Sequence, residues 1–585
     1  MIRSLYQRIQ SSLDSNQIPV LVFFSSLFIF ISFAGTRLFL SDDGVILDQF
    51  YNLINGSLAL KIAKISTAKG VFILVGNNLY GIFSYSLLFL ALPVFYVLGA
   101  IDSIYGAHLF LLILWAFSGG FTVYLIAKIR NLKYAVIAGA AAFFMLTAAN
   151  LYYFKPIYFS MWGELLSLEF TNIFISSLLV LVVYLLFKKF FGIKIGIFAS
   201  FFIIFATPIS FYAITLKHHT LAIFLTLLAF YLFHEYTEKK DNKFIYFAYL
   251  SAGLVIWTRI LDGAVLMASL LIADVLLFKR GIKHIAIIFA VIIISLAPFL
   301  SFNYLILGDP FSIIETTPLA DRPVTLSAAE DFISLDESPF QTRQIELLNE
   351  LGYRWNTKIR TDLVGILMNI MILKSVNTSG IFLVSPFLIT AIAFPLYRLK
   401  NRIKLNTMEK FLALYIVLLI AAYVNHLASI IIDTPAVLEY RYLLILYVVL
   451  LYFALRVDNV RQAVECNLKK IVFLYGIILI SALIYCIYRF PLPFLSVYDQ
   501  VALITSASLI TVLSIRLFIT EKKLGTSLDK SLVYLIALSF ALSSCLLIFY
   551  YWVVSMTYIS PSQNHAIIPI MENILRWMYE IVFTF

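Results

Sequence analysis

Two adjacent acids, Asp42 and Asp43, follow the first long apolar stretch of the chain. That stretch, residues 20–40, carries a single charge and is about long enough to span a bilayer. The basic residues before it, Arg3 and Arg8, are expected to stay in the cytoplasm, so the acids emerge on the outer side. Adjacent carboxylates repel each other, and a solvated helix cap would explain them without chemistry. The short polar helix and the long loop that are expected next favour a catalytic role.

Further charged groups are predicted at the outer ends of other helices. Placing a charge inside a membrane costs about 3 kcal/mol or more, so such groups are rare and tend to be functional. Acids and cations that converge from separate helices suit a reaction in which an acid deprotonates an acceptor while cations hold a lipid phosphate. The residues in this set are Lys61, Lys64, Lys69, Lys155, Glu164, Lys217, His218, His219, Arg259, Asp262, Glu439 and Arg441.

Three of these residues also have a purely structural interpretation. Arg259 could pair with Asp262 and hold a loop together, or extend toward the membrane surface. Arg441, between two tyrosines, could anchor a helix at the interface. Glu164 is predicted to be an acid at a helix N-terminus, where it interacts favourably with the helix dipole.

The histidines and the first group of lysines are interpreted in the same way. His218 and His219 are adjacent, and neighbours on a helix point about 100° apart, so interfacial hydrogen bonds are favoured over metal binding. Lys61 and Lys64 are expected to face lipid headgroups. Lys69 is the exception, because it precedes an apolar segment that is expected to re-enter the membrane.

The composition is that of an integral membrane protein. The chain is 62% hydrophobic and 13% charged, with a mean hydropathy of +0.96, whereas soluble domains are about a quarter charged. Its long apolar segments indicate helices and not barrel strands. The formal charge of +11 does not indicate nucleic-acid binding, because the basic residues form short clusters at segment ends, as membrane orientation requires.

These basic clusters also predict the topology. All of them can lie on the cytoplasmic face if residues 71–100 lie along the outer interface or re-enter, since one crossing there would invert every later cluster. The long outer loops are then 41–106 and 305–379, and residues 361–373 are expected to lie on the membrane surface. The predicted spans are 20–40, 107–127, 133–151, 170–187, 195–213, 219–235, 244–258, 263–278, 284–304, 380–397, 409–431, 441–455, 470–488, 499–519 and 531–553.

Five short motifs resemble those of the GT-C-type membrane glycosyltransferases, which include the protein mannosyltransferases and the aminoarabinose transferase of lipid A. The first is Asp42-Asp43-Gly44 followed by the amphipathic residues 46–60. The others are the apolar segment 85–99, the Asn-Tyr to Gly-Asp-Pro-Phe turn of 303–311, Ile-Trp-Thr-Arg at 256–259 and Tyr-Arg-Tyr-Leu at 440–443.

The resemblance implies an all-α polytopic membrane protein, a GT-C-like bundle of about 13–15 transmembrane helices with interfacial helices in the first and a later outer loop. Residues 1–455 would form the catalytic module, and residues 456–585 the C-terminal helices and an outer tail. The expected partners are membrane lipids and a polyprenyl- or dolichyl-phosphate sugar donor. The donor's sugar would be transferred with inversion on the extracytoplasmic or lumenal side.

The resemblance also implies roles for individual residues. Asp42 or Asp43 would be the general base, and Glu164 would replace a second-loop acid that is usually aspartate. Lys69, Arg259 and Arg441 would hold the donor phosphate, and loop 305–379 would cap the site. The reaction requires no cofactor, although one branch of the family uses a divalent metal bound by the first-loop acid.

The main alternative is a lipid or lipid-linked-sugar transporter or flippase without catalysis. Such proteins carry charges near the bilayer midplane and often contain internal repeats. Here the midplane is nearly free of charge, with Asp274 as an exception near a basic end, and no repeat is apparent. A lipid-linked oligosaccharide ligase or polymerase would share the architecture but use basic residues in its large outer loop.

Overall fold

The computed structural model describes residues 17–36, 41–65, 72–278, 282–314, 326–333, 380–433, 441–489, 492–518, 522–557 and 566–574, with a few isolated positions elsewhere. These residues form two compact units. Unit 1 comprises Met1–Val182, Tyr212–Gln341 and Val554–Arg576, and unit 2 comprises Val183–Phe211, Thr342–Val553 and Trp577–Phe585. The predicted functional boundary at residue 455 remains a prediction.

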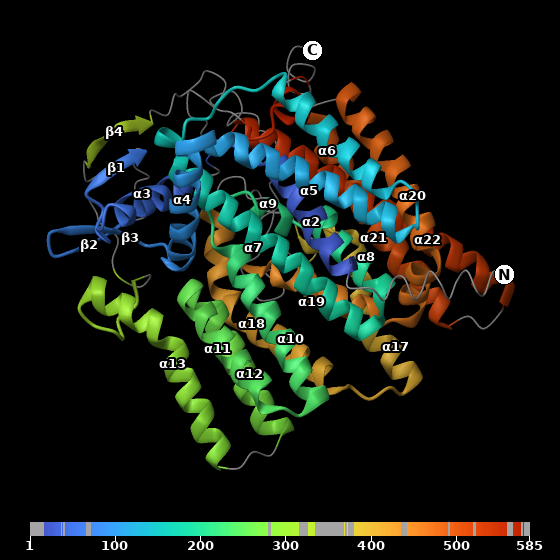
Figure 1. The fold of residues 1–585 in the computed structure, drawn as a ribbon. Coiled ribbons are helices and arrows are strands. Elements are labelled where there is room, and N and C mark those ends of the chain that lie inside the picture. Colours follow the sequence, from blue (N-terminus) through green and yellow to red (C-terminus); the bar gives the residue numbers. More distant parts are fainter. Residues whose placement is uncertain are drawn as a thin grey trace. The chain divides into compact units, whose positions relative to one another are not determined.

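Helices dominate the described part of the chain (Figure 1), which confirms the prediction of a helical multi-pass membrane protein. Within it, nine helices are long and apolar enough to cross a membrane. They are α4 (Ser86–Tyr105), α5 (Ala107–Ile129), α7 (Phe159–Phe191), α10 (His219–Lys239), α13 (Ile282–Leu307), α18 (Thr407–Asp433), α20 (Asp458–Arg489), α21 (Leu492–Phe518) and α22 (Lys522–Thr557). Shorter helices are α2 (Gln17–Ser32), α6 (Ala135–Leu151), α8 (Ile193–Ala206), α9 (Ile209–Tyr212), α11 (Asn242–Thr258), α12 (Ile260–Leu277) and α19 (Ile445–Leu455).

The first helix ends earlier than predicted. The expected span 20–40 is replaced by α2, which stops at Ser32. Beyond it the backbone bonds to other parts of unit 1: Gly35 N–H donates to Glu169 Oε1 (3.1 Å), and Ala34 C=O accepts from Ile567 N–H (2.9 Å). Because these groups are satisfied by long-range partners, the helix does not have to continue to satisfy them.

The C-terminal segment is built into unit 1. Ala566 and Gly35 form an isolated antiparallel bridge. His108, buried on α5, accepts a hydrogen bond from Ile157 N–H at Nδ1 (3.1 Å), so its Nε2 carries the proton and donates to Ile567 C=O (2.8 Å). Asn150 of α6 accepts from the next turn of the same segment, at Ile570 N–H (3.0 Å). The end of the chain therefore ties α2, α5 and α6 together.

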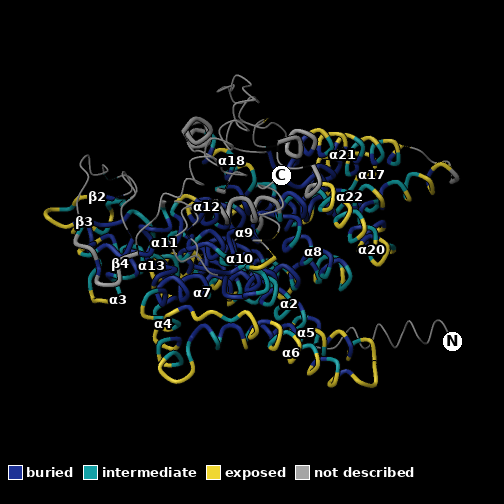
Figure 2. Tube along the Cα trace, turned by 90° about the horizontal axis from the view of Figure 1, so that it is seen from above, coloured by how far each residue is buried: buried dark blue, intermediate teal, exposed yellow. Residues whose placement is uncertain are grey.

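Two helices of unit 1 approach each other closely at glycines. A Cβ at Gly120 of α5 would lie 2.8 Å from Gly139 C=O of α6, and one at Gly139 would lie 2.6 Å from Tyr124 Cβ. Small residues allow such contact between membrane helices. Most of the remaining surface of α6 is exposed within unit 1 (Figure 2).

The predicted first outer loop contains strands as well as a helix, which corrects two predictions. Residues 71–100 were expected to form one interfacial or re-entrant segment, but Phe72–Val75 (β2) and Asn78–Gly81 (β3) form a hairpin, and α4 follows as a helix long enough to span. The two-residue turn Gly76-Asn77, with Gly76 at φ +61°, explains the hairpin. The amphipathic stretch 46–60 is replaced by α3, Ser41–Ile54, which starts earlier and carries the two acids.

A second small sheet joins the two long outer loops. Ile62–Ile65 (β1) pairs in parallel with Ser327–Ile333 (β4), which lies far away in the sequence but beside β1 in space (Figure 1). Helix α3 packs against both β1 and β3. The predicted surface segment 361–373 lies outside the described residues, as does most of the loop expected to cap the site.

In unit 2, the predicted span 380–397 is broken into three pieces. They are α16 (Ile381–Val384), the 3₁₀ helix η2 (Pro386–Ile392) and α17 (Ala393–Asn401). Pro386 has no backbone N–H, so the helical ladder is interrupted there. Neighbouring hydroxyls satisfy the freed carbonyls: Tyr498 donates to Leu383 C=O (2.7 Å), and Ser506 donates to Phe382 C=O (3.2 Å). Irregular backbone is tolerated in membrane proteins where it is buried in protein.

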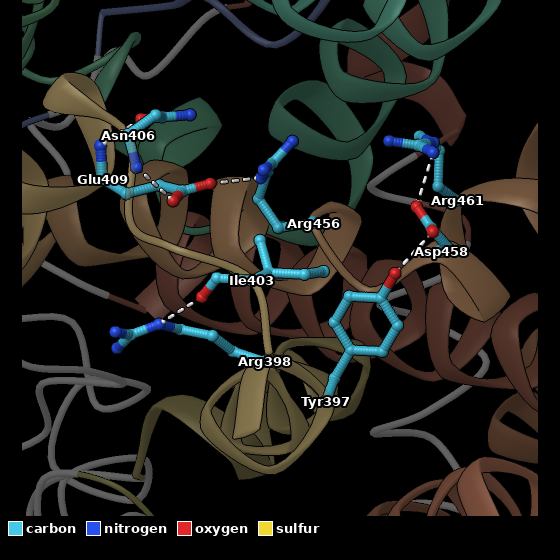
Figure 3. A network of polar contacts seen from close by, with 8 residues as sticks. All are labelled: Tyr397, Arg398, Ile403, Asn406, Glu409, Arg456, Asp458 and Arg461. Carbon is cyan, nitrogen blue, oxygen red and sulfur yellow. Dashed lines mark hydrogen bonds and ion pairs between the residues drawn. The ribbon is translucent and has the colours of Figure 1, made fainter. Parts of the chain in front are cut away.

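A polar network joins four helices of unit 2 at their predicted cytoplasmic ends (Figure 3). Asn406 and Glu409 form a reciprocal cap at the start of α18, with N–H to side-chain distances of 2.7 and 2.9 Å. Glu409, which is fully buried, also pairs with Arg456 at the end of α19. The Tyr397 hydroxyl of α17 donates to Asp458 of α20. These contacts therefore hold the end of α18 against the end of α19, and the end of α17 against α20.

Candidate active site

The two acids that open the sequence lie in the first turn of α3. Carboxylates in that position interact favourably with the positive end of the helix dipole. Asp43 is fully buried, whereas the Asp42 side chain retains 18% of its exposure. Asp42 Oδ2 lies 2.5 Å from Lys217 Nζ, and this lysine side chain is only 4% exposed. The Asp42 carboxylate is therefore paired with a cation and still reachable from solvent.

The loop that carries Lys217 is held by one amide side chain of α7, which was not predicted. Asn172 is fully buried and donates to the carbonyls of Tyr212 (2.8 Å), Thr215 (2.8 Å) and Lys217 (3.2 Å). Its own carbonyl accepts from the Thr220 hydroxyl. Asn172 thus fixes the chain before α10 and the first turn of that helix.

Arg259 occupies the extended residue between α11 and α12, at φ −151° and ψ 105°. It is nearly buried, and its guanidinium lies 3.0 Å from His219 Nδ1 and 3.1 Å from Asp262 Oδ2. Arginine can only donate, so Nδ1 of His219 is the accepting, unprotonated nitrogen. His218 precedes α10, with its ring centroid 5.5 Å from that of His219. The predicted pairing of Arg259 with Asp262 is present, in a buried setting that also includes a histidine.

The break between α11 and α12 depends on a glycine, which gives a prediction. A Cβ at Gly263 would lie 2.2 Å from the backbone nitrogen of Ile256, and backbone atoms have little freedom to move away. Gly263→Ala should therefore cost about 1–3 kcal/mol of stability through overpacking and lower the apparent melting temperature in detergent. Gly476→Ala on α20 is the control, because a Cβ there meets nothing within 4 Å. Equal melting temperatures for the two variants would contradict the close packing.

Lys64 and Glu164 form a buried ion pair, contrary to the expectation for each residue. The Lys64 ammonium lies 3.5 Å from Glu164 Oε2, with side chains 0% and 9% exposed. Lys64 was expected to face headgroups, but α3 and the strands cover it; burial lowers the pKa of the Lys64 ammonium, and the Glu164 charge partly offsets this. Glu164 lies in the second turn of α7 and not at its N-terminus, and Lys64 is its partner.

The other predicted candidates are either exposed or have side chains outside the described residues. Lys61 and Lys155 are exposed. Lys69 and Glu439 lie outside the described residues. Arg441 begins the short 3₁₀ helix η3 (Arg441–Leu443) in unit 2, and its side chain is not among those described.

An apolar cavity of about 590 Å³ lies in unit 1 between α4, α7, α10 and α11. It reaches Trp257 and Thr258, the two residues before Arg259, and Ser84 Oγ donates to the carbonyl of Trp257 (2.6 Å). The cavity therefore reaches the chain just before the buried arginine, and most of its lining consists of hydrocarbon side chains. Its lining residues are Ser86, Leu90, Val94, Phe170, Thr171, Phe174, Ile175, Leu178, Leu221, Phe224, Leu225, Leu254, Trp257 and Thr258.

Metal ligands do not gather in the described part of unit 1 or unit 2. Among the residues that the structure describes, no three acids, histidines or cysteines are placed to hold one ion. The charges of the site are instead arranged as pairs: Asp42 with Lys217, Glu164 with Lys64, and Asp262 with Arg259.

The fold and the membrane-length helices define the chain as an integral, multi-pass membrane protein. No family model and no curated protein matches the sequence. Among solved structures, the chain is similar to ArnT from Cupriavidus metallidurans in the apo state, with a TM-score of 0.42 and 11% identity over 92% of this chain and 77% of that one. It is also similar to the same protein bound to undecaprenyl phosphate, with a TM-score of 0.40 and 11% identity over 92% and 76%.

Proposed function

We propose that this protein is a membrane glycosyltransferase. It moves a sugar from a polyprenyl- or dolichyl-phosphate donor to a lipid, glycan or protein acceptor on the extracytoplasmic or lumenal side, with inversion at the anomeric carbon. One observation carries the proposal: unit 1 contains three acid–cation pairs whose cations are all buried, and the residues just before one of these cations, Arg259, line an apolar cavity. A polyprenyl phosphate combines an anionic head with a hydrocarbon chain, so it matches both parts.

Asp42 is the proposed general base. An acceptor hydroxyl attacks the anomeric carbon and transfers its proton to the carboxylate, while the bond from that carbon to the phosphate oxygen breaks. The electron pair leaves with the polyprenyl phosphate. The pairing with Lys217 at 2.5 Å favours the ionised carboxylate that a base needs, and the remaining exposure gives the acceptor access. Asp43 and Glu164 support the charge arrangement from buried positions.

Arg259 is the proposed phosphate-binding residue, because it is a buried cation that directly follows Trp257 and Thr258, which line the cavity. A cation at the leaving phosphate stabilises the charge that develops there in the transition state. Lys64 and Lys217 are further buried cations of the same unit. The same role for Lys69 and Arg441, and the use of a divalent metal, remain expectations from the family resemblance.

The cavity is the proposed site for the first part of the polyprenyl chain. Its volume of about 590 Å³ falls within the usual range for ligand pockets, about 300–1,000 Å³. Its apolar walls would keep the hydrocarbon of the polyprenyl chain away from polar groups. A chain held there would place its phosphate near Arg259 and its sugar toward the acids.

Filling the cavity should weaken the binding of donors with a long isoprenoid chain. Leu225→Trp enlarges a lining residue, so we expect the KM for an undecaprenyl-phosphate sugar to rise about tenfold or more, corresponding to about 1.4 kcal/mol. A donor with only one or two isoprene units should be affected less. Ile293→Trp, on a 64% exposed position of α13, is the matched control. Equal changes for long and short donors, or for both variants, would argue against this use of the cavity.

The activity itself is tested with the purified full-length protein in lipid nanodiscs. Polyprenyl-phosphate donors that carry different radiolabelled sugars are incubated with candidate lipid, glycan and protein acceptors, and product is separated from donor. The proposal predicts transfer to at least one acceptor class with inverted anomeric configuration. The transporter alternative predicts that the same protein, in sealed vesicles, moves the lipid-linked sugar between leaflets without forming product.

A further inference from the structure

Helix α3 binds the backbone of β1 through side chains one turn apart. Asn52 accepts from Lys61 N–H (3.0 Å) and Ile62 N–H (3.2 Å), and its amide nitrogen donates to Ile62 C=O (2.7 Å). Asn52 thus replaces a neighbouring strand on this edge of β1. No sequence pattern had singled it out.

Asp48 continues this contact one helical turn earlier. Its Oδ1 accepts from Lys64 N–H at 2.7 Å and from Ile65 N–H at 3.0 Å, and the residue is fully buried. Hydrogen bonds from two successive amides hold that part of the strand at a defined distance from α3. The carboxyl group of Asp48 on α3 therefore fixes the backbone at Lys64.

The opposite edge of β1 explains why this support is needed at Lys64. Ala63 pairs with Ala328 of β4 and Ile65 pairs with Ile333, so the register is irregular between them. Irregular positions in a strand redirect a side chain and leave local backbone groups without regular ladder partners. Lys64 lies at this irregularity, and Asp48 accepts its N–H from the other side.

We infer that Asp48 is a positioning residue, which fixes the backbone of β1 so that the Lys64 ammonium reaches Glu164 inside the site. The inference rests on the proposed function for the meaning of that ion pair in catalysis. The geometry itself involves only α3, β1 and α7. Without the Asp48 acceptor, two amides would be buried without a partner, and the strand would shift until water or another group satisfied them.

The protonation of Asp48 gives this contact a pH dependence. Burial raises the pKa of the Asp48 carboxyl from 3.8 to about 7, although the two amides act to lower it. Within the described residues, Oδ2 has no hydrogen-bond partner. Because the folded-state pKa is raised, the stability that this group contributes is full below about pH 4 and is lost as the pH rises through 7.

Asp48→Asn should therefore remove part of the pH dependence of stability. The other titratable groups on α3, β1 and β3 are Asp42, Asp43, Tyr51, Lys64 and Tyr80, and Lys61 directly precedes β1. Between pH 5 and pH 8, the apparent melting temperature of the wild type should fall relative to that of the variant. Parallel curves would show that Asp48 is ionised across this range in the folded protein.

The positioning role is tested by the reactivity of Lys64, whose side chain is fully buried. The folded protein is treated with an amine-directed reagent, and modification at Lys64 is measured by mass spectrometry. Wild type and Asp48→Asn, which keeps an acceptor oxygen, should stay protected. Asp48→Ala should be modified at least tenfold faster. Asp241→Ala is the matched control, because Asp241 also accepts from a backbone N–H (Lys243, 3.1 Å) but on an exposed helix cap.

Affinity for undecaprenyl phosphate is measured on the same four proteins. We expect Asp48→Ala to bind about tenfold more weakly, while Asp48→Asn and Asp241→Ala stay close to wild type. If Lys64 stays protected in Asp48→Ala, the inference is overturned. If wild type does not bind the lipid, the proposed function fails, whereas the labelling result still decides the role of Asp48. Should Asp48→Ala not fold, Asp48→Gln, which displaces the acceptor by one carbon, is used and interpreted in the same way.

Discussion

Asparagine at position 42 should lower the rate of sugar transfer by a factor of about 10²–10⁴, the usual contribution of a positioned general base. Asparagine has the same shape but cannot take the proton of the acceptor hydroxyl. Because the side-chain shape is kept, the core packing stays unchanged and expression should stay near that of wild type. The melting temperature should fall moderately, because the buried Lys217 ammonium loses its charged partner. The measurement is single-turnover transfer from a radiolabelled polyprenyl-phosphate sugar.

Asp43→Asn should also reduce transfer strongly, because a buried carboxylate in the first turn of α3 supports the same charge arrangement. The two variants differ in access: Asp42 is partly exposed and Asp43 is not. Asp309→Asn, at an exposed turn that also uses its carboxylate to bind backbone, is the control and should transfer at the wild-type rate. Wild-type transfer by both site variants would remove the catalytic assignment of the acid pair.

Arg259→Ala should weaken donor binding about 10- to 100-fold, since hydrogen bonds that involve a charged group contribute about 1.5–3 kcal/mol. The loss should appear mainly in the KM for the donor and in the affinity for undecaprenyl phosphate. Arg259→Lys should recover only part of the affinity, because lysine keeps the charge but not the planar fork of donors that contacts both His219 and Asp262.

A matched control for Arg259 exists in unit 2. Arg461 pairs with Asp458 at the same three-residue spacing, 2.5 Å apart, but at a partly exposed position. Arg461→Ala removes an equivalent pair and should leave donor affinity unchanged. If both alanine variants bind the donor as wild type does, Arg259 does not hold the phosphate.

The sequence alone could predict which polar residues converge, because membrane topology restricts where they can lie. Acids and cations that face the outer side must come together at a few helix ends, and Asp42, Lys217, His219 and Arg259 do so within unit 1. The pairing of Arg259 with Asp262 was also foreseeable, because the residue that precedes a helix lies close to the third residue of the first turn.

The partners of the first outer loop were not predictable in this way. Strand β1 finds its neighbour in β4, far along the chain, and no local pattern specifies a parallel pair between two loops. The sequence therefore predicts that Lys64 lies in the headgroup region, whereas in the structure it pairs with Glu164. The hairpin after it could have been predicted, because Gly76-Asn77 between two apolar runs is a turn signal. The length of the whole apolar segment, 71–100, favours a single membrane segment instead and hides that signal.

The cavity was invisible in the sequence for a different reason. Its lining residues, such as Leu178, Phe224 and Leu254, have the same side-chain types as residues that face lipid. Only the packing of α4, α7, α10 and α11 distinguishes a hydrocarbon-lined cavity from a lipid-facing surface. Asn172 was missed because a single amide within an apolar helix gives no periodic signal, although it orders the whole loop before α10.

The most direct test is an experimental structure of the full-length protein in nanodiscs with undecaprenyl phosphate bound. We expect the phosphate to lie within hydrogen-bonding distance of the Arg259 guanidinium, with the first isoprene units in the cavity lined by Trp257 and Leu225. The Asp42 carboxylate should face the leaving oxygen across the space for one sugar. A phosphate bound only at the basic ends of the helices, with the cavity empty and Asp42 facing away, would contradict both expectations.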